Sequence, residues 1–258
     1  RPDTVRNALK AGLNEGYKEF HLTSEDSGAY GRDIDTSLPE LLESITRIKG
    51  KFFVRVGMMN PLHFKKMELK NLIKSYMDEK IFKFLHLCVQ SGSNEVLKVM
   101  RRGYEVEDFA CYIQEFRSEI PKLNLMTDII VGHPGETEED FEKSIDLIKK
   151  VKPDAVIISK FGARPGTLAA KMEKIDPEIM NERSKLLHEI AKKISLENNQ
   201  AWVGWEGEVI IDEEGEGFVE GRNFAYKPII IKEKINLGSI ANAKIIDAKP
   251  NFLIGKLQ

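Results

Sequence analysis

Apolar segments recur along the first 200 residues at nearly constant spacing, and this spacing constrains the fold more than any other feature. The predicted strands start at residues 19, 52, 84, 125 and 155, which gives intervals of 33, 32, 41 and 30 residues. A strand, a right-handed crossover helix and their loops need about 30 residues. The spacing therefore predicts five parallel strands with helices outside: Glu19–Thr23, Phe52–Val56, Phe84–Val89, Leu125–Val131 and Ala155–Lys160.

Amphipathic segments between those strands predict the helices. Ser37 with Glu40, and Thr137 with Asp140, have the spacing of a capping box. The predicted helices are Thr4–Glu15, Leu38–Ile48, Glu68–Met77, one from Glu95, Val106–Glu119, Thr137–Val151, and Pro177 to about Asn198. Because a helix opens the chain with no strand before it, we expect a sixth strand upstream. The predicted fold class is α/β, a partial (β/α)6 TIM-like barrel that lacks its first strand.

The sequence pattern changes after Asn199. From there the apolar runs are short and are separated by glycine and asparagine turns: Val209–Ile211, Phe218–Val219, Pro228–Ile231, Ala243–Ile246 and Phe252–Ile254. This spacing predicts a small all-β barrel of OB-like size. We therefore predict two domains, residues 1–199 and residues 200–258, and we expect Trp202 and Trp205 to pack the second onto the first.

Composition sets modest limits on function. The formal net charge of −2 provides no global field that would attract nucleic acid. We see no apolar run near 18 residues and no leading signal sequence, so we expect no membrane partner and a cytoplasmic location. The two cysteines, Cys88 and Cys111, are too few for a disulfide framework. We expect both to be buried structural thiols.

Strand alternation indicates which side chains face the interior of the barrel. Alternate positions on the predicted strands are wholly apolar on one face and should pack under the helices. The other faces carry Arg55, His86, Gln90 and Asp128, all near the carboxyl ends of their strands. These groups could satisfy one another as core hydrogen bonds. We favour a polar ligand site, because ligands bind at that edge in parallel α/β proteins.

The loops that follow four of the strands support a ligand site at the same edge. They contain serine, glycine and acidic residues, and backbone N–H groups at helix starts suit a carboxylate, ribose or phosphate. The loops are Ser24-Glu25-Asp26, Gln90-Ser91-Gly92-Ser93, Gly132-His133-Pro134-Gly135-Glu136 and Arg164-Pro165-Gly166-Thr167. Each loop alone would more often be an ordinary turn, but such loops after four of the five predicted strands indicate a shared site.

An ordered set of short motifs resembles the methylthiotransferase family of radical S-adenosylmethionine (SAM) enzymes. The motifs are Leu22–Asp26 with Ala29–Gly31, Val89–Ser93, Met100–Tyr104, Thr127–Phe141, and Ala163–Thr167 with Ala169–Met172. The segments Gly221–Asn223, Tyr226–Pro228 and Leu253–Gly255 resemble the TRAM domain of those proteins. The resemblance covers essentially the whole chain, and the branch that modifies N6-threonylcarbamoyladenosine beside the tRNA anticodon is most similar.

The resemblance implies SAM and [4Fe-4S] clusters as the cofactors of an intact parent enzyme. Family members bind a cluster with a Cys-x3-Cys-x2-Cys loop that this sequence lacks, so we expect a carboxy-terminal fragment without metal ligands. We also expect it to have no radical activity and weak SAM binding. By position, Ser24 and Glu25 would meet the SAM amino and carboxylate groups. Ribose or carboxylate groups would meet Gln90, Ser91 and Asp128, and a carboxylate could pair with Arg55 or Lys160.

The resemblance implies tRNA as the partner. Arg102 could face the substrate, and Arg222, Tyr226 and Lys227 of the TRAM-like segment could bind RNA. Residues 202–258 contain seven Lys/Arg and nine Asp/Glu, so this segment is net acidic. Its charge keeps open a second hypothesis, a methylthiotransferase that acts on a ribosomal protein side chain. A third is a non-enzymatic RNA-binding module on a degenerate barrel.

Overall fold

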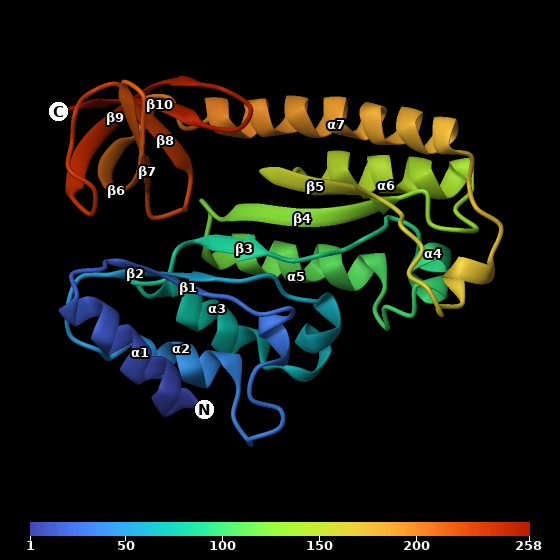
Figure 1. Cartoon of the computed structure of the whole chain (residues 1–258), viewed down its shortest axis with the longest axis horizontal. Helices are drawn as coiled ribbons and strands as arrows, with labels where there is room; N and C mark the ends of the chain where they lie inside the picture. Colours follow the sequence, from blue (N-terminus) through green and yellow to red (C-terminus); the bar gives the residue numbers. More distant parts are fainter.

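The computed structural model describes residues 1–258, the side chain of Lys66 apart. Strands and helices alternate as far as α7, and strands alone follow it (Figure 1). The helices are α1 Pro2–Asn14, α2 Leu38–Thr46, α3 Leu69–Met77, α4 Asn94–Val99, α5 Val106–Glu119, α6 Glu138–Val151 and α7 Pro177–Gln200. The strands are β1 Glu19–Leu22, β2 Phe53–Val56, β3 Phe84–His86, β4 Asn124–Val131, β5 Ala155–Lys160, β6 Glu206–Gly215, β7 Phe218–Arg222, β8 Pro228–Ile231, β9 Ile240–Ala248 and β10 Leu253–Leu257.

The five predicted parallel strands are present and lie side by side in chain order. β1 pairs with β2, and β3 pairs with β4 and β4 with β5, all parallel. The strands form two sheets, β1-β2 and β3-β4-β5, because β2 and β3 meet only through isolated parallel bridges, Val54 to Ile81 and Met59 to Leu87. Between these bridges, Lys83 N–H donates to Phe224 O in the second domain, 2.8 Å away. β3 is therefore short.

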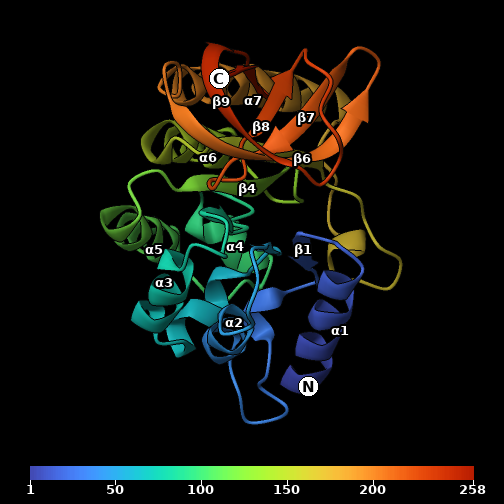
Figure 2. The ribbon, with the colours of Figure 1, turned by 90° about the vertical axis from the view of Figure 1, so that its left-hand side faces the viewer.

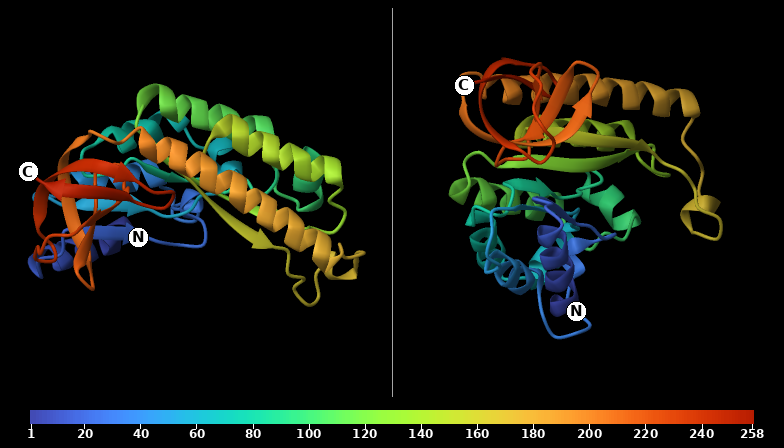
Figure 3. Two further views of the ribbon diagram at one scale, coloured as in Figure 1. Left: turned by 90° about the horizontal axis from the view of Figure 1, so that it is seen from above. Right: turned by 60° about the vertical axis from the view of Figure 1, so that its left-hand side comes forward.

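Helices cover the apolar face of the sheet, as the alternation predicts. Leu85, Leu87 and Val89 are fully buried in the core, together with Leu125 and Ile129 of β4. Both predicted capping boxes form, at the starts of α2 and α6. Figure 3 shows α6 and α7 side by side over β5. Among the described residues, no helix is both long enough and apolar enough to cross a membrane.

The strands after α7 form a closed barrel in the order β10-β8-β7-β6-β9 (Figure 2). Its core contains Val209, Ile229 and Leu253, each fully buried, so the predicted short apolar runs are barrel strands. Trp202 and Trp205 lie 5.8 Å apart between ring centroids and pack mainly within this barrel core. The second domain is thus a small all-β unit.

The second domain packs against the amino ends of the sheet strands, opposite the predicted ligand edge (Figure 1). Lys227 is buried there, and its Nζ lies 2.7 Å from Asp154 Oδ1 and 2.8 Å from Asn199 Oδ1. Asn124 Nδ2 at the start of β4 donates to Ala225 O at 2.9 Å. A charged, fully paired contact therefore joins the two domains.

One prediction about the cysteines was wrong. Cys88 is buried, but Cys111 is exposed on α5. The buried positions of that helix are Phe109, Ile113 and Phe116, which follow the period of a helix that buries one face. Position 111 falls on the opposite face, so Cys111 points to solvent.

Candidate functional site

The loops after β1, β3 and β4 meet at the carboxyl edge of the sheet, where the sequence predicts a ligand site. After β1, Ser24 Oγ lies 3.2 Å from Ser27 Oγ, and the Ser27 N–H donates to the loop after β2. That loop donates in turn to the end of β3, and Gln90 N–H donates to Asp128 O of β4 at 2.8 Å. Continuous contacts therefore join the segments that carry Ser24, Gln90 and Asp128.

Asp128 lies beside two side chains of the neighbouring chain segment. Its Oδ1 lies 3.0 Å from His86 Nε2, and the Cys88 sulfur lies within 4.8 Å of both. Burial alone would raise the pKa of Asp128, but the hydrogen bond from His86, the nearby Cys88 thiol and the charge of Arg102 hold that pKa below its usual value. The carboxyl is therefore ionised at neutral pH, and 19% of its side chain is exposed to a ligand.

Arg102 approaches the same carboxylate from the loop after α4. Its positive charge helps to lower the pKa of both Asp128 and His133. Burial has the larger effect on each, and it raises the pKa of Asp128 but lowers that of His133. Arg102 Nε is buried and has no hydrogen-bond partner among the described atoms. A buried donor without a partner costs free energy that an anionic ligand would recover. Arg102 is therefore a cation at this edge whose side chain retains an unpaired donor within the described part of the chain.

The Gln90–Ser93 loop has a fixed shape and packs closely on α6. Gln90 has a φ of 73°, and a Cβ at Gly92 would overlap the backbone of α6. Gly92 N–H and Ser93 Oγ donate to side chains of α6 at 2.8 and 2.6 Å. Ser91 is fully buried, and its Oγ accepts the Ser93 N–H. Ser91 thus shapes the loop from inside rather than facing a cofactor.

The loops after β4 and β5 differ in how they are held. The Glu136 carboxylate accepts the Gly132 N–H at 2.9 Å and pairs with Arg183 of α7 at 2.8 Å. Burial raises the pKa of Glu136, although Gly132 and Arg183 oppose the shift. Residues 164–167, in contrast, are exposed. The first loop is fixed to α7, and the second lies at the surface.

Three residues predicted to bind the cofactor are arranged differently from the group around Asp128. Glu25 is exposed beside Ser24. Lys160, at the end of β5, donates to Asn181 of α7. The Arg55 guanidinium lies over two aromatic rings, 4.9 Å from the Phe84 centroid and 5.2 Å from that of Tyr226. The structure therefore places Arg55 toward the domain junction.

The three residues predicted to bind RNA also lie at that junction. Arg222 pairs with Asp212 at 2.9 Å and with Glu220 at 2.7 Å. Tyr226 packs on several rings of the first domain, and burial raises its pKa to about 12. Lys227 is 3% exposed and has both partners described above. Tyr226 and Lys227 therefore join the two domains, whereas the ion pairs of Arg222 lie within the barrel, and we assign all three residues a structural role.

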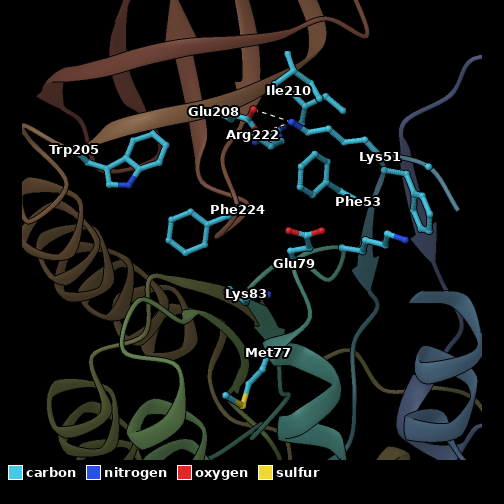
Figure 4. Close-up of a pocket in the computed structure, with 14 residues that line it drawn as sticks. Lys51, Phe53, Met77, Glu79, Lys83, Trp205, Glu208, Ile210, Arg222 and Phe224 are labelled. Carbon is cyan, nitrogen blue, oxygen red and sulfur yellow. Dashed lines mark hydrogen bonds and ion pairs between the residues drawn. The ribbon is translucent and has the colours of Figure 1, made fainter. Parts of the chain in front are cut away.

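A hollow of about 720 Å³ between the domains was not predicted from the sequence (Figure 4). Ring faces of Phe53, Trp205 and Phe224 line it, and Lys51 pairs with Glu208 across it at 2.7 Å. Burial lowers the pKa of Lys83, another lining residue, to about 8. The lining comes from segments more than 100 residues apart, so no local motif could have indicated it. It lies away from Ser24 and Asp128.

The parallel α/β sheet and the polar groups at its carboxyl edge define the class of protein, and a family model confirms it. Residues 1–148 match the radical SAM superfamily, and the chain belongs to that superfamily. It is 47% identical over 257 residues to "Probable threonylcarbamoyladenosine tRNA methylthiotransferase" of Pyrococcus abyssi, covering 99% of this chain and 60% of that protein. The protein of the same name from Archaeoglobus fulgidus is 45% identical over 98% of this chain and 59% of its own length. The human threonylcarbamoyladenosine tRNA methylthiotransferase is 33% identical over 98% of this chain and 44% of its own length.

The cysteines of this sequence do not fit an iron–sulfur cluster. Radical SAM proteins use SAM and a [4Fe-4S] cluster that is bound by cysteine thiolates. This sequence has two cysteines, one buried beside Asp128 and one exposed on α5. The cluster ligands are therefore not among the residues of this chain.

Proposed function

We propose that this chain is the SAM-binding part of a methylthiotransferase that modifies N6-threonylcarbamoyladenosine in tRNA. The observation that carries the proposal is the match over 99% of the chain, at 47% identity, to a relative with that name. The chain spans about 60% of the length of such relatives, so the activity of the whole protein is part of the proposal. The gathering of polar groups at the carboxyl edge supports a ligand site there.

Four side chains at this edge are our candidates for direct contact with SAM. We assign the amino and carboxylate groups of SAM to Ser24 and Glu25, which lie in the exposed loop after β1. We assign the ribose hydroxyls to Gln90 and to the ionised carboxylate of Asp128, which can accept two hydrogen bonds. Arg102 would pair with a carboxylate or with a substrate phosphate.

SAM titration tests the cofactor assignment. Because this chain lacks the cluster ligands, we expect weak binding that saturation-transfer NMR detects and calorimetry resolves only at high SAM concentration. Asp128→Asn should weaken the signal, and Asp146→Asn, an exposed change on α6, should leave it unaltered. Micromolar SAM affinity without a cluster would contradict the partial site. Equal signals from the two variants would contradict the role of Asp128.

The second domain is our candidate for contact with tRNA, as a TRAM-like unit. Its buried cations are already paired, so the contact would use exposed lysines such as Lys232 and Lys234. Binding of the chain to tRNA and to a basic ribosomal protein can be compared at several salt concentrations. Preferential binding of tRNA supports the proposal. Preference for the protein favours the second hypothesis, a ribosomal protein substrate, and the acidic charge of the domain is the observation behind it.

We also propose that this chain alone lacks methylthiotransferase activity. The reason is the missing set of cysteine ligands, since Cys88 and Cys111 lie on different elements and differ in burial. The chain can be incubated with SAM, iron, sulfide, a reductant and tRNA that carries threonylcarbamoyladenosine. Mass spectrometry of the digested tRNA should show no methylthio product, and the appearance of product would refute the proposal.

A further inference from the structure

His86, Cys88 and Asp128 bring three different donor atoms to one point at the carboxyl edge of the sheet. The imidazole nitrogen, the thiol sulfur and a carboxylate oxygen all lie within 4.8 Å of one another. His86 and Cys88 are two residues apart and so share one face of an extended chain. The pairing of His86 with Met126 places Asp128 beside Cys88 on the next strand. Two adjacent strands therefore build the group.

The donor set suits a divalent cation of the zinc type. Imidazole nitrogen, thiolate sulfur and carboxylate oxygen are all zinc ligands, whereas magnesium and calcium prefer oxygen alone. Metal–ligand distances of about 2.0–2.3 Å around a tetrahedral centre place neighbouring ligand atoms about 3.3–3.8 Å apart. His86 Nε2 and Asp128 Oδ1 already lie 3.0 Å apart. The Cys88 sulfur lies within 4.8 Å of both atoms, so it would need to move by no more than about 1 Å to reach this spacing.

The backbone around the three residues is held on both sides. Met59 N–H donates to His86 O at 2.9 Å, and Cys88 N–H donates to Met59 O at 3.0 Å. Tyr104 Oη donates to the carbonyl oxygens of Cys88 and Val89, at 3.2 and 2.8 Å. The donor atoms therefore start from fixed backbone positions, and binding would lose little conformational entropy.

Charge at the site would balance when a divalent cation binds. The thiol proton of Cys88 passes to water, and the imidazole proton moves to Nδ1, so that Nε2 can bind the metal. One thiolate and the Asp128 carboxylate then neutralise the two positive charges. The positive charge of Arg102 is opposed by Asp26, since both act on the Cys88 thiol. No net charge is then buried at the site.

We propose that His86, Cys88 and Asp128 form a binding site for one zinc-type divalent cation, with water or another small ligand in the fourth position. This pattern of three protein ligands and one open position is that of zinc sites that take part in chemistry. The side chain of Asp128 is partly exposed, so the fourth position can be reached from solvent. The site is separate from iron–sulfur binding. Because the Asp128 carboxylate is also our candidate for the SAM ribose, the cation and SAM would compete for it.

Titration with Co²⁺ tests the site, because a thiolate bound to Co²⁺ gives a sulfur-to-metal charge-transfer absorption. The whole chain, reduced with a phosphine and free of SAM and RNA, should bind one Co²⁺ with this absorption. Added Zn²⁺ should abolish the absorption. Cys88→Ser should remove the band. Loss of an outer-sphere partner typically weakens metal binding by about 10- to 100-fold, so Asp128→Asn, which removes a direct ligand, should weaken Co²⁺ binding at least as much.

Cys111→Ser provides the matched control, because it removes the exposed thiol and leaves the three donors intact. This variant should keep the band and the affinity of the original chain. Circular dichroism of each variant confirms that it is folded. The proposal is overturned if the folded chain gives no band, if folded Cys88→Ser keeps it, or if Cys111→Ser loses it.

Discussion

Replacing Lys227 with methionine would remove the central charge of the domain junction. The amine and the Asp154 carboxylate are both largely buried, with 4% and 9% of their side chains exposed. Removing one partner of a buried ion pair typically costs about 3–5 kcal/mol, because the remaining charge has lost both water and partner. Asn199 Oδ1 would also lose its donor. At about 2–4 °C per kcal/mol for a chain near this size, the melting temperature should fall by about 6–20 °C.

Urea denaturation and thermal unfolding measure this loss against a matched control. Lys249→Met removes an exposed ion pair, since 48% of the Lys249 side chain and 53% of the Asp247 side chain are accessible to solvent. This change should lower the free energy of unfolding by no more than about 1 kcal/mol. Adding Asp154→Asn to Lys227→Met should recover part of the loss. The amide still accepts the Leu125 N–H but leaves no charge unpaired. Equal losses for Lys227→Met and Lys249→Met would refute the reasoning.

A glycine, a helix cap and a buried carboxyl give three further predictions. Gly92→Ala should destabilise by more than about 1 kcal/mol because its Cβ overlaps the α6 backbone, whereas Gly162→Ala, with open space around it, should change little in the same thermal assay. Thr137→Ala should cost about 1 kcal/mol by urea denaturation, since the Thr137 hydroxyl caps α6; an unchanged midpoint would contradict this. Burial raises the pKa of Asp212 from 3.8 to about 6, so the folded state holds more protons than the unfolded state between these values. The stability of the original chain relative to Asp212→Asn should therefore fall as the pH rises from about 4 to 6, and a constant difference from pH 4 to 7 would count against it.

Local sequence signals predicted the elements of this fold well. The capping boxes at Ser37 and Thr137 depend on residues only three positions apart, and both form as predicted. The alternation on β3 and β4 correctly gave the apolar face that packs under the helices. The break between β2 and β3 could not be predicted, because it depends on Lys83 meeting Phe224, 141 residues later in the chain.

The composition of the candidate site was less predictable than its position. Parallel topology places strand ends together, which is why Gln90 and Asp128 were identified as neighbours. Whether a charged side chain faces a ligand or another part of the protein depends on which other segments pack against it. Arg55 and Lys227 both contact the opposite domain. An isolated sequence motif contains no information about that domain's placement.

The position of the second domain also restricts how a ligand can reach the sheet interior. Tyr226 packs against Phe84 at the amino end of β3, and Arg55 of β2 lies over both rings. Separating the two domains at this buried aromatic and charged junction would cost free energy. A ligand should therefore reach the group around Asp128 from the carboxyl edge of the sheet. Arg102, whose buried Nε has no described hydrogen-bond partner, lies at that edge.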